Sequence, residues 1–116
     1  MASGRLPGDQ PVPERIAGEL ERYRQRIDEL DEKLVRLLNE RATCANEIGR
    51  LKERVGMEVY QPGRERAVLE HVRRVNAGPL TDVAMIRLFE RIIDESRRLE
   101  RLGDEGELED GEPDNG

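Results

Sequence analysis

Arg41 is a basic residue on an apolar stripe, and it is the first indication of chemistry in this 116-residue sequence. Counted from Ile27, apolar residues recur every seven positions, and Arg41 occupies one of these positions. A second seven-residue series contains only apolar or small residues: Leu30, Leu37, Cys44 and Leu51. An unpaired charge in an apolar interior costs on the order of several kcal/mol. Because no acidic residue stands beside Arg41 on the same face, the pattern predicts an anion or water as its partner.

Lys52 is a second cation on the same helical face. It follows Arg41 by eleven residues, which at 100° per residue returns to within about 20° of the same direction. Four more polar residues lie beside apolar positions of later helical stretches: Arg64, Glu65, Ser96 and Glu100. Together these side chains predict a polar pocket lined mostly by cations. The expected ligand is a small anion with more than one carboxylate or phosphate.

The sequence also allows a plainer interpretation of the same residues. With eighteen arginines in the chain, some fall near an apolar stripe by chance, with aliphatic stems on apolar surface and charged ends in water. Ser96 is of a type often tolerated on helices, and Cys44 is expected to pack in the core rather than act as a nucleophile. No metal-ligand spacing, phosphate-binding glycine loop or Ser/His/Asp arrangement occurs, so neither a metal nor a cofactor is expected.

A very long helix must position Arg41 and Lys52. Residues 14–55 contain no proline, and from Ile27 to Val55 the apolar residues keep helical spacing. A helix of about 40 residues would reach about 60 Å, which exceeds the diameter of a compact chain of this size. Such a helix needs another chain to lie against, and a homodimer is the simplest arrangement.

Two shorter helices are expected to follow. Gly56 should end the first helix, and Pro62 suits the first turn of a second helix that runs to about Val75. Thr81 or Asp82 can cap a third helix, which continues to about residue 102. No strand-like alternation is present, so the predicted fold class is all-α with three helices.

The two ends of the chain are expected to be disordered around a domain of residues 14–102. Residues 1–13 are rich in proline, and residues 103–116 carry seven acidic residues and no basic one. Without that tail the chain has 20 basic and 19 acidic residues, which together with its few aromatics argues against nucleic-acid binding. With one cysteine, no signal-peptide pattern and no membrane-spanning apolar run, the chain is expected to be cytoplasmic and independent of membranes.

Three segments, taken in order, resemble the all-helical class of chorismate mutases. They are "RQRIDELDEKLVRLLNERATCANEIGRLK", "YQPGRERAVLEHV" and "LFERIIDESRRLE", and the resemblance covers residues 20–102. It implies an intertwined homodimer of three-helix chains with two identical sites. It also implies the rearrangement of chorismate to prephenate, a step toward phenylalanine and tyrosine. This intramolecular [3,3] reaction needs no nucleophile, metal or cofactor, because the enzyme holds the substrate in its reactive conformation.

The resemblance implies a role for each candidate residue. Arg24 and Arg41 would bind the two carboxylates of chorismate, with Arg24 reaching into the partner's site. Arg24 lies about 100° around the helix from Arg41, which agrees with a contact in the site of the other subunit. Lys52 and Glu100 would contact the ether oxygen, on which negative charge grows as the carbon–oxygen bond breaks. The remaining substrate contacts would be Gln61, Arg64, Glu65 on the ring hydroxyl, and Ser96.

Two positions depart from the family pattern. Gln61 stands where many members carry aspartate, and its backbone could still contact the ligand. Glu100 stands where bacterial relatives often carry glutamine. An ionised carboxylate would repel the developing oxyanion, so Glu100 must be protonated to donate a hydrogen bond. Turnover is therefore expected to fall as the pH rises.

Other functions fit parts of the same pattern. An isochorismate pyruvate lyase or a 4-amino-4-deoxychorismate mutase would use almost the same cationic pocket, although Glu65 favours chorismate. A helical dimerisation module without activity is the alternative from another class. It would tolerate replacement of Arg24, Arg41 and Lys52 by uncharged residues. Another enzyme of the shikimate pathway is a candidate docking partner.

Overall fold

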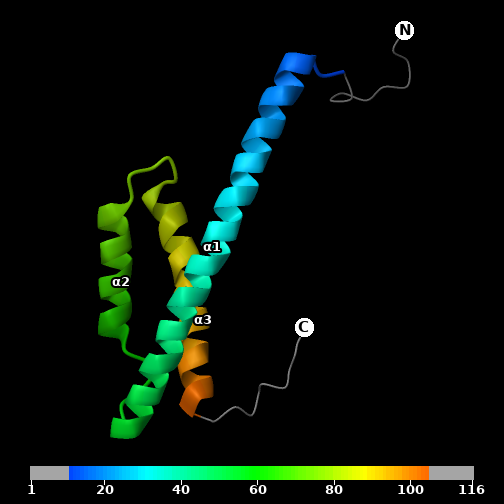
Figure 1. The fold of residues 1–116 in the computed structure, drawn as a ribbon. Coiled ribbons are helices and arrows are strands. Elements are labelled where there is room, and N and C mark those ends of the chain that lie inside the picture. The colour runs from blue at the N-terminus through cyan, green and yellow to red at the C-terminus, as the bar shows by residue number, and fades with distance from the viewer. Residues whose placement is uncertain (1–10, 105–116) are drawn as a thin grey trace, which may run out of the picture. The chain divides into compact units, whose positions relative to one another are not determined.

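The structure, a computed structural model, describes residues 11–104 as three helices: α1 (Glu14–Val55), α2 (Pro62–Val75) and α3 (Asp82–Asp104) (Figure 1). No strand occurs within this range. The predicted all-α class with a very long first helix is confirmed, and α3 continues two residues beyond the predicted end. Residues 1–10 and 105–116, which form most of the predicted arm and tail, lie outside the described residues.

Gly56 ends α1 because it adopts a backbone conformation that other residues avoid. Its φ is +69°, in the left-handed region where a Cβ atom is unfavourable. The N–H of Gly56 donates to the carbonyl oxygen of Glu53 at 3.2 Å, and the N–H of Met57 donates to that of Lys52 at 2.8 Å. This pair of hydrogen bonds is the Schellman motif, which satisfies carbonyl groups left free at a helix end. The chain thereby turns away directly after the turn that carries Lys52.

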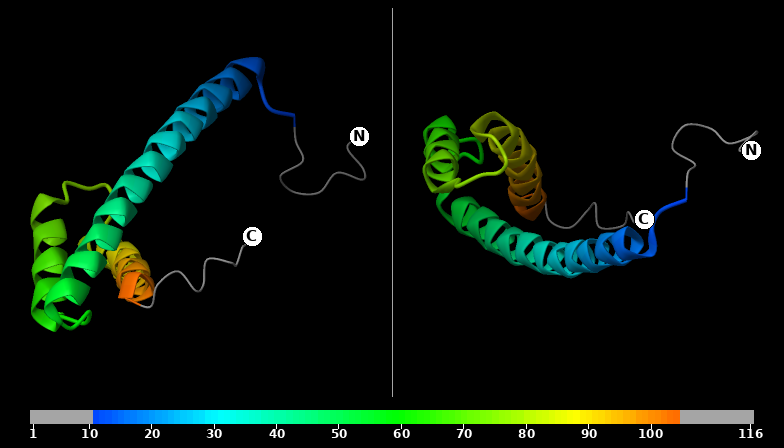
Figure 2. Two further views of the ribbon diagram at one scale, coloured as in Figure 1. Left: turned by 60° about the horizontal axis from the view of Figure 1, so that its bottom comes forward. Right: turned by 90° about the horizontal axis from the view of Figure 1, so that it is seen from above.

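The helices α2 and α3 form an antiparallel hairpin (Figure 1 and Figure 2). Asn76, just after α2, donates from its side-chain nitrogen to the carbonyl of Leu80 at 2.9 Å and to the carboxylate of Asp82 at 2.8 Å. The Thr81 hydroxyl accepts a hydrogen bond from the N–H of Ala84 at 3.1 Å, which caps α3 as predicted. These contacts fix the short connector that returns the chain alongside α2.

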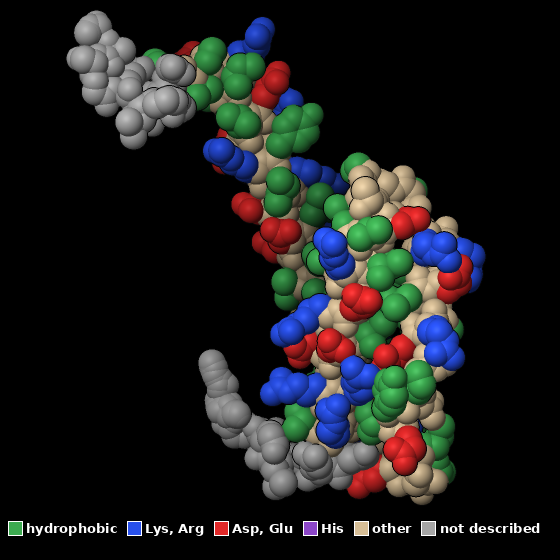
Figure 3. Space-filling model, turned by 180° about the vertical axis from the view of Figure 1, so that it is seen from behind, with side chains coloured by type: hydrophobic (Ala, Val, Ile, Leu, Met, Phe, Trp, Pro, Cys, Tyr) green, Lys and Arg blue, Asp and Glu red, His purple; other side chains and the backbone are tan. Residues whose placement is uncertain are grey.

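The described chain falls into two units, which divide α1 between Leu38 and Asn39. In the first unit every residue from Pro11 to Leu38 is exposed, including the apolar residues of the predicted stripe. Figure 3 shows hydrophobic side chains at the surface of this stretch, between acidic and basic ones. The stripe is exposed in the single chain, and its burial against a second chain stays a prediction. No helix within residues 11–104 is both long and apolar enough to cross a membrane.

The second unit, residues 39–104, has a small core. Its buried apolar side chains are Ala45 of α1, Val72 of α2 and Ile93 of α3, with 4%, 6% and 8% of their surface exposed. Gly49 is also buried, and a Cβ atom there would lie 2.8 Å from both Cα and the carbonyl oxygen of Glu100. The backbones of α1 and α3 can approach this closely only because position 49 has no side chain. Cys44 is exposed, so the expectation of core packing is wrong for this residue in a single chain.

Candidate active site

A pocket of about 200 Å³ lies within the second unit, between the C-terminal part of α1, the α1–α2 connector, α2 and α3. It contains every predicted site residue except Arg24: Arg41, Lys52, Gln61, Arg64, Glu65, Ser96 and Glu100. Apolar side chains line the rest of it, among them Ile48, Val68 and Ile93. Arg24 belongs to the first unit and does not line this pocket. The pocket thus brings together residues that helical counting placed beside apolar positions of three separate helices.

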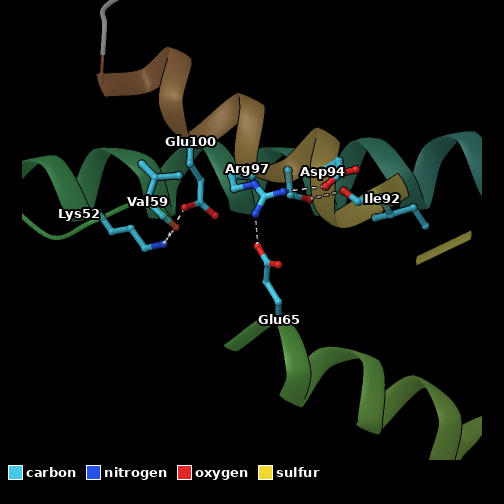
Figure 4. Close-up of polar contacts among 8 residues, drawn as sticks. Lys52, Val59, Glu65, Ile92, Asp94, Arg97 and Glu100 are labelled. Atoms are coloured by element: carbon cyan, nitrogen blue, oxygen red, sulfur yellow. Dashed lines mark hydrogen bonds and ion pairs between the residues drawn. The ribbon is translucent and has the colours of Figure 1, made fainter. Parts of the chain in front are cut away.

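Lys52 and Glu100 form an ion pair across α1 and α3 (Figure 4). The Lys52 Nζ atom donates to Glu100 Oε1 at 2.7 Å and to the carbonyl oxygen of Val59 at 3.1 Å. The two charged side chains are only 12% and 13% exposed. The close helix crossing at Gly49 brings Glu100 to α1, and Lys52 follows Gly49 by one turn. The site therefore holds an ammonium group in a fixed and largely water-free position.

Arg41 is held by a neutral partner. Its Nη1 atom donates a hydrogen bond to Ser96 Oγ, which in turn donates to the carbonyl oxygen of Ile92 at 3.0 Å. Ser96 thus orients the guanidinium without neutralising it. Among residues 11–104, neither Arg41 nor Arg64 has an acidic partner. Two guanidinium groups on the pocket wall are therefore available to an anion.

Gln61 sets the start of α2. Its carbonyl oxygen accepts hydrogen bonds from the N–H groups of Arg64 at 3.0 Å and Glu65 at 3.2 Å. Pro62 takes the first helical position, where its missing N–H has no cost. The side chain of Gln61 makes no capping hydrogen bond. This first turn places Arg64 and Glu65 together on the pocket wall.

Arg97 is a pocket residue that the sequence analysis missed. Its Nη1 atom donates to Glu65 Oε2 at 2.7 Å, and its Nη2 atom donates to Asp94 Oδ1 at 2.8 Å (Figure 4). The guanidinium carbon also lies 5.2 Å from the centre of the Tyr60 ring. One signal could have found it: Arg97 follows the buried Ile93 by four residues and so shares its face of α3.

The charges of the pocket suit a doubly negative ligand. Four basic residues and two acidic ones line it, a net charge of +2. Each acidic residue is already paired, Glu100 with Lys52 and Glu65 with Arg97. No group of histidine, cysteine and acidic residues with the arrangement of a metal site occurs in the described part of the chain. Fold and site together define an all-helical protein with a cationic pocket between its three helices.

Residues 23–101 match the chorismate mutase type II family, and the chain belongs to that family. It is 40% identical over 99 residues to the bifunctional chorismate mutase/prephenate dehydratase of Pseudomonas aeruginosa, an alignment that covers 76% of this chain and 27% of that protein. It is 34% identical over 85 residues to the 4-amino-4-deoxychorismate mutase of Streptomyces venezuelae, covering 72% of this chain and 82% of that protein.

A solved structure has the same fold. The chorismate mutase (Form II) of Thermus thermophilus superposes with a TM-score of 0.70 at 34% sequence identity, covering 72% of this chain and 94% of that one. The chain thus spans about a quarter of the length of the bifunctional relatives that it matches, but nearly the full length of this structural neighbour.

Proposed function

We propose that this chain is a chorismate mutase, which converts chorismate to prephenate by an intramolecular [3,3] rearrangement. The observation that carries the proposal is the pair of unneutralised guanidinium groups, Arg41 and Arg64, in a pocket of net charge +2. Chorismate carries two carboxylates, and arginine recognises carboxylates with two parallel hydrogen bonds. Family membership supports the same reaction.

The proposed mechanism needs only binding and fixed charge. Arg41 and Arg64 bind the carboxylates and hold the substrate in the folded conformer in which the reacting carbon atoms meet. Glu65 accepts a hydrogen bond from the ring hydroxyl. Lys52 faces the ether oxygen, and its ammonium interacts more strongly with the transition state than with the substrate because negative charge grows there.

The partners of Lys52 support this role. Val59 and Glu100 fix the ammonium before the substrate arrives, so little reorganisation is needed as the carbon–oxygen bond breaks. In the free pocket Glu100 accepts a hydrogen bond from Lys52. Beside the ether oxygen it can donate one only when protonated.

Glu100→Gln tests whether the carboxylate at position 100 limits turnover. The glutamine amide can donate a hydrogen bond to the ether oxygen, which an ionised carboxylate cannot, so kcat/KM for chorismate should be higher than in the wild-type protein. Both proteins would be assayed with chorismate under the same conditions. A lower kcat/KM in Glu100→Gln would contradict a need for a hydrogen-bond donor at this position.

We also infer a homodimer that is formed along α1. Its first part carries apolar residues spaced alternately by four and three positions: Ile16, Leu20, Tyr23, Ile27, Leu30, Leu34 and Leu37. Their exposed fractions range from 37% to 65%. A repeat of this period is the seam by which helices pair in coiled coils. A second copy of the chain would cover it, and Arg24 from that copy would join Arg41 and Arg64 as a third guanidinium group available to the substrate.

A mixing experiment tests the shared site. Arg24→Ala and Arg41→Ala should each have very low activity alone, because every site then lacks either Arg24 or Arg41. In a heterodimer of the two variants one site has both. An equal mixture that is refolded together should recover about a quarter of wild-type activity, since half the dimers are mixed and each has one intact site. Recovery is the predicted result, whereas a mixture as inactive as its components would contradict a site shared between two chains.

A further inference from the structure

We propose that Arg97 determines specificity at the substrate ring, making the pocket prefer a hydroxyl group over an amine beside Glu65. The inference rests on the proposed function and extends it to a residue outside the predicted set. The two candidate substrates differ at this point: chorismate has a ring hydroxyl where 4-amino-4-deoxychorismate has an amine. Proteins similar to this chain include named mutases of both kinds.

The contact between Arg97 and Glu65 links α3 to the first turn of α2. Arg97 Nη1 donates to Glu65 Oε2 at 2.7 Å, and the two side chains are 25% and 27% exposed. Figure 4 shows the two side chains extending toward each other from their helices. Glu65 Oε2 is thus occupied, whereas no described residue donates a hydrogen bond to Oε1. One acceptor oxygen remains for the substrate.

Two further contacts fix the guanidinium of Arg97 in this position. Asp94 accepts a hydrogen bond from Nη2 at 2.8 Å, and the Tyr60 ring lies beneath the guanidinium carbon, 5.2 Å away. Asp94 is 58% exposed, so water screens its charge more than that of Glu65. Arg97 is therefore held by α3 and the connector, and it can position Glu65 for a ligand.

The charges of this pair favour a neutral group on the substrate. The carboxylate of Glu65 and the guanidinium of Arg97 sum to zero, so a cation beside them gains little net attraction. A hydroxyl is neutral and needs only the one free oxygen as an acceptor. A protonated amine would bring its positive charge close to Arg97, and the repulsion is strong in a partly buried site. Arg97 thus acts against the amine, in addition to positioning Glu65 for the hydroxyl.

The test compares kcat/KM for chorismate with kcat/KM for 4-amino-4-deoxychorismate in four proteins. Arg97→Gln removes the positive charge and should shift the ratio toward the amine by about tenfold. Arg97→Lys keeps the charge and should keep most of the preference. Arg98→Gln is the matched control, because Arg98 is on the same helix, is 68% exposed and does not line the pocket. It should have the wild-type ratio.

Each outcome has one meaning. If Arg97→Gln still converts chorismate and its ratio of the two kcat/KM values equals that of the wild-type protein, the inference about Arg97 is wrong and the proposed function stands. Equal losses for both substrates would also overturn it, because they would show a role limited to pocket structure. A folded wild-type protein that converts neither substrate would overturn the proposed function and the inference with it.

Discussion

Replacement of Lys52 by methionine is expected to lower kcat for chorismate by about 10²–10³-fold, the loss typical when a donor to a developing oxyanion is removed. Methionine keeps an unbranched side chain and a high helix propensity, so α1 should remain intact. The ammonium is fixed by Glu100 and Val59 in a site where it is only 12% exposed. A charge placed there acts through little water, which is why its loss should have a large effect.

The stability of the same variant needs a separate control. Without Lys52, the carboxylate of Glu100 has no cationic partner at a position that is 13% exposed. The double variant Lys52→Met/Glu100→Gln removes this charge and should recover most of the lost stability, but none of the turnover. Lys33→Met, at an exposed position of α1, should leave kcat unchanged. A Lys52→Met protein with more than about a tenth of wild-type kcat would contradict the role of Lys52.

Replacement of Gly49 by alanine is expected to lower both stability and turnover, although Gly49 does not line the pocket. The new Cβ atom would lie 2.8 Å from Cα and the carbonyl oxygen of Glu100, and backbone atoms cannot move aside as a flexible side chain can. α3 must therefore shift away from α1. Overpacking of this kind costs about 1–3 kcal/mol of stability. The shift also moves Glu100 relative to Lys52, and a displacement of about 1 Å can lower turnover about 10²-fold.

Gly63→Ala is the matched control for this prediction. At position 63 the nearest atom to an added Cβ is the end of the Arg66 side chain, 3.9 Å away. Because Gly63 is in the first turn of α2, where glycine costs less than in the middle of a helix, this variant should be at least as stable as the wild-type protein. Urea denaturation would measure stability, and the chorismate assay would measure turnover. Wild-type stability and turnover in Gly49→Ala would show that the close crossing is not required.

The helices could be predicted from the sequence because their boundaries depend on local signals. Gly56 and Pro62 act through the conformations of their own backbones, and Thr81 caps α3 with its own hydroxyl. Most of the pocket wall could be predicted for a related reason. The period of the helix alone places positions 41 and 52 on one face, and this placement does not depend on contacts with other helices.

Contacts between helices could not be predicted in this way. The pairing of Lys52 with Glu100 depends on where α3 crosses α1, which is set by the close approach at Gly49. Arg97 was missed because its partner Glu65 is on another helix and 32 residues away. The apolar stripe of α1 was expected to lie against a second chain, but its spacing alone does not fix which residues of that chain it would contact.

The most direct test of the central proposal is to incubate the purified protein with chorismate, follow the loss of its ultraviolet absorbance and identify the product by chromatography. We predict that prephenate forms as chorismate is lost. A folded protein that leaves chorismate unchanged at every pH would contradict it.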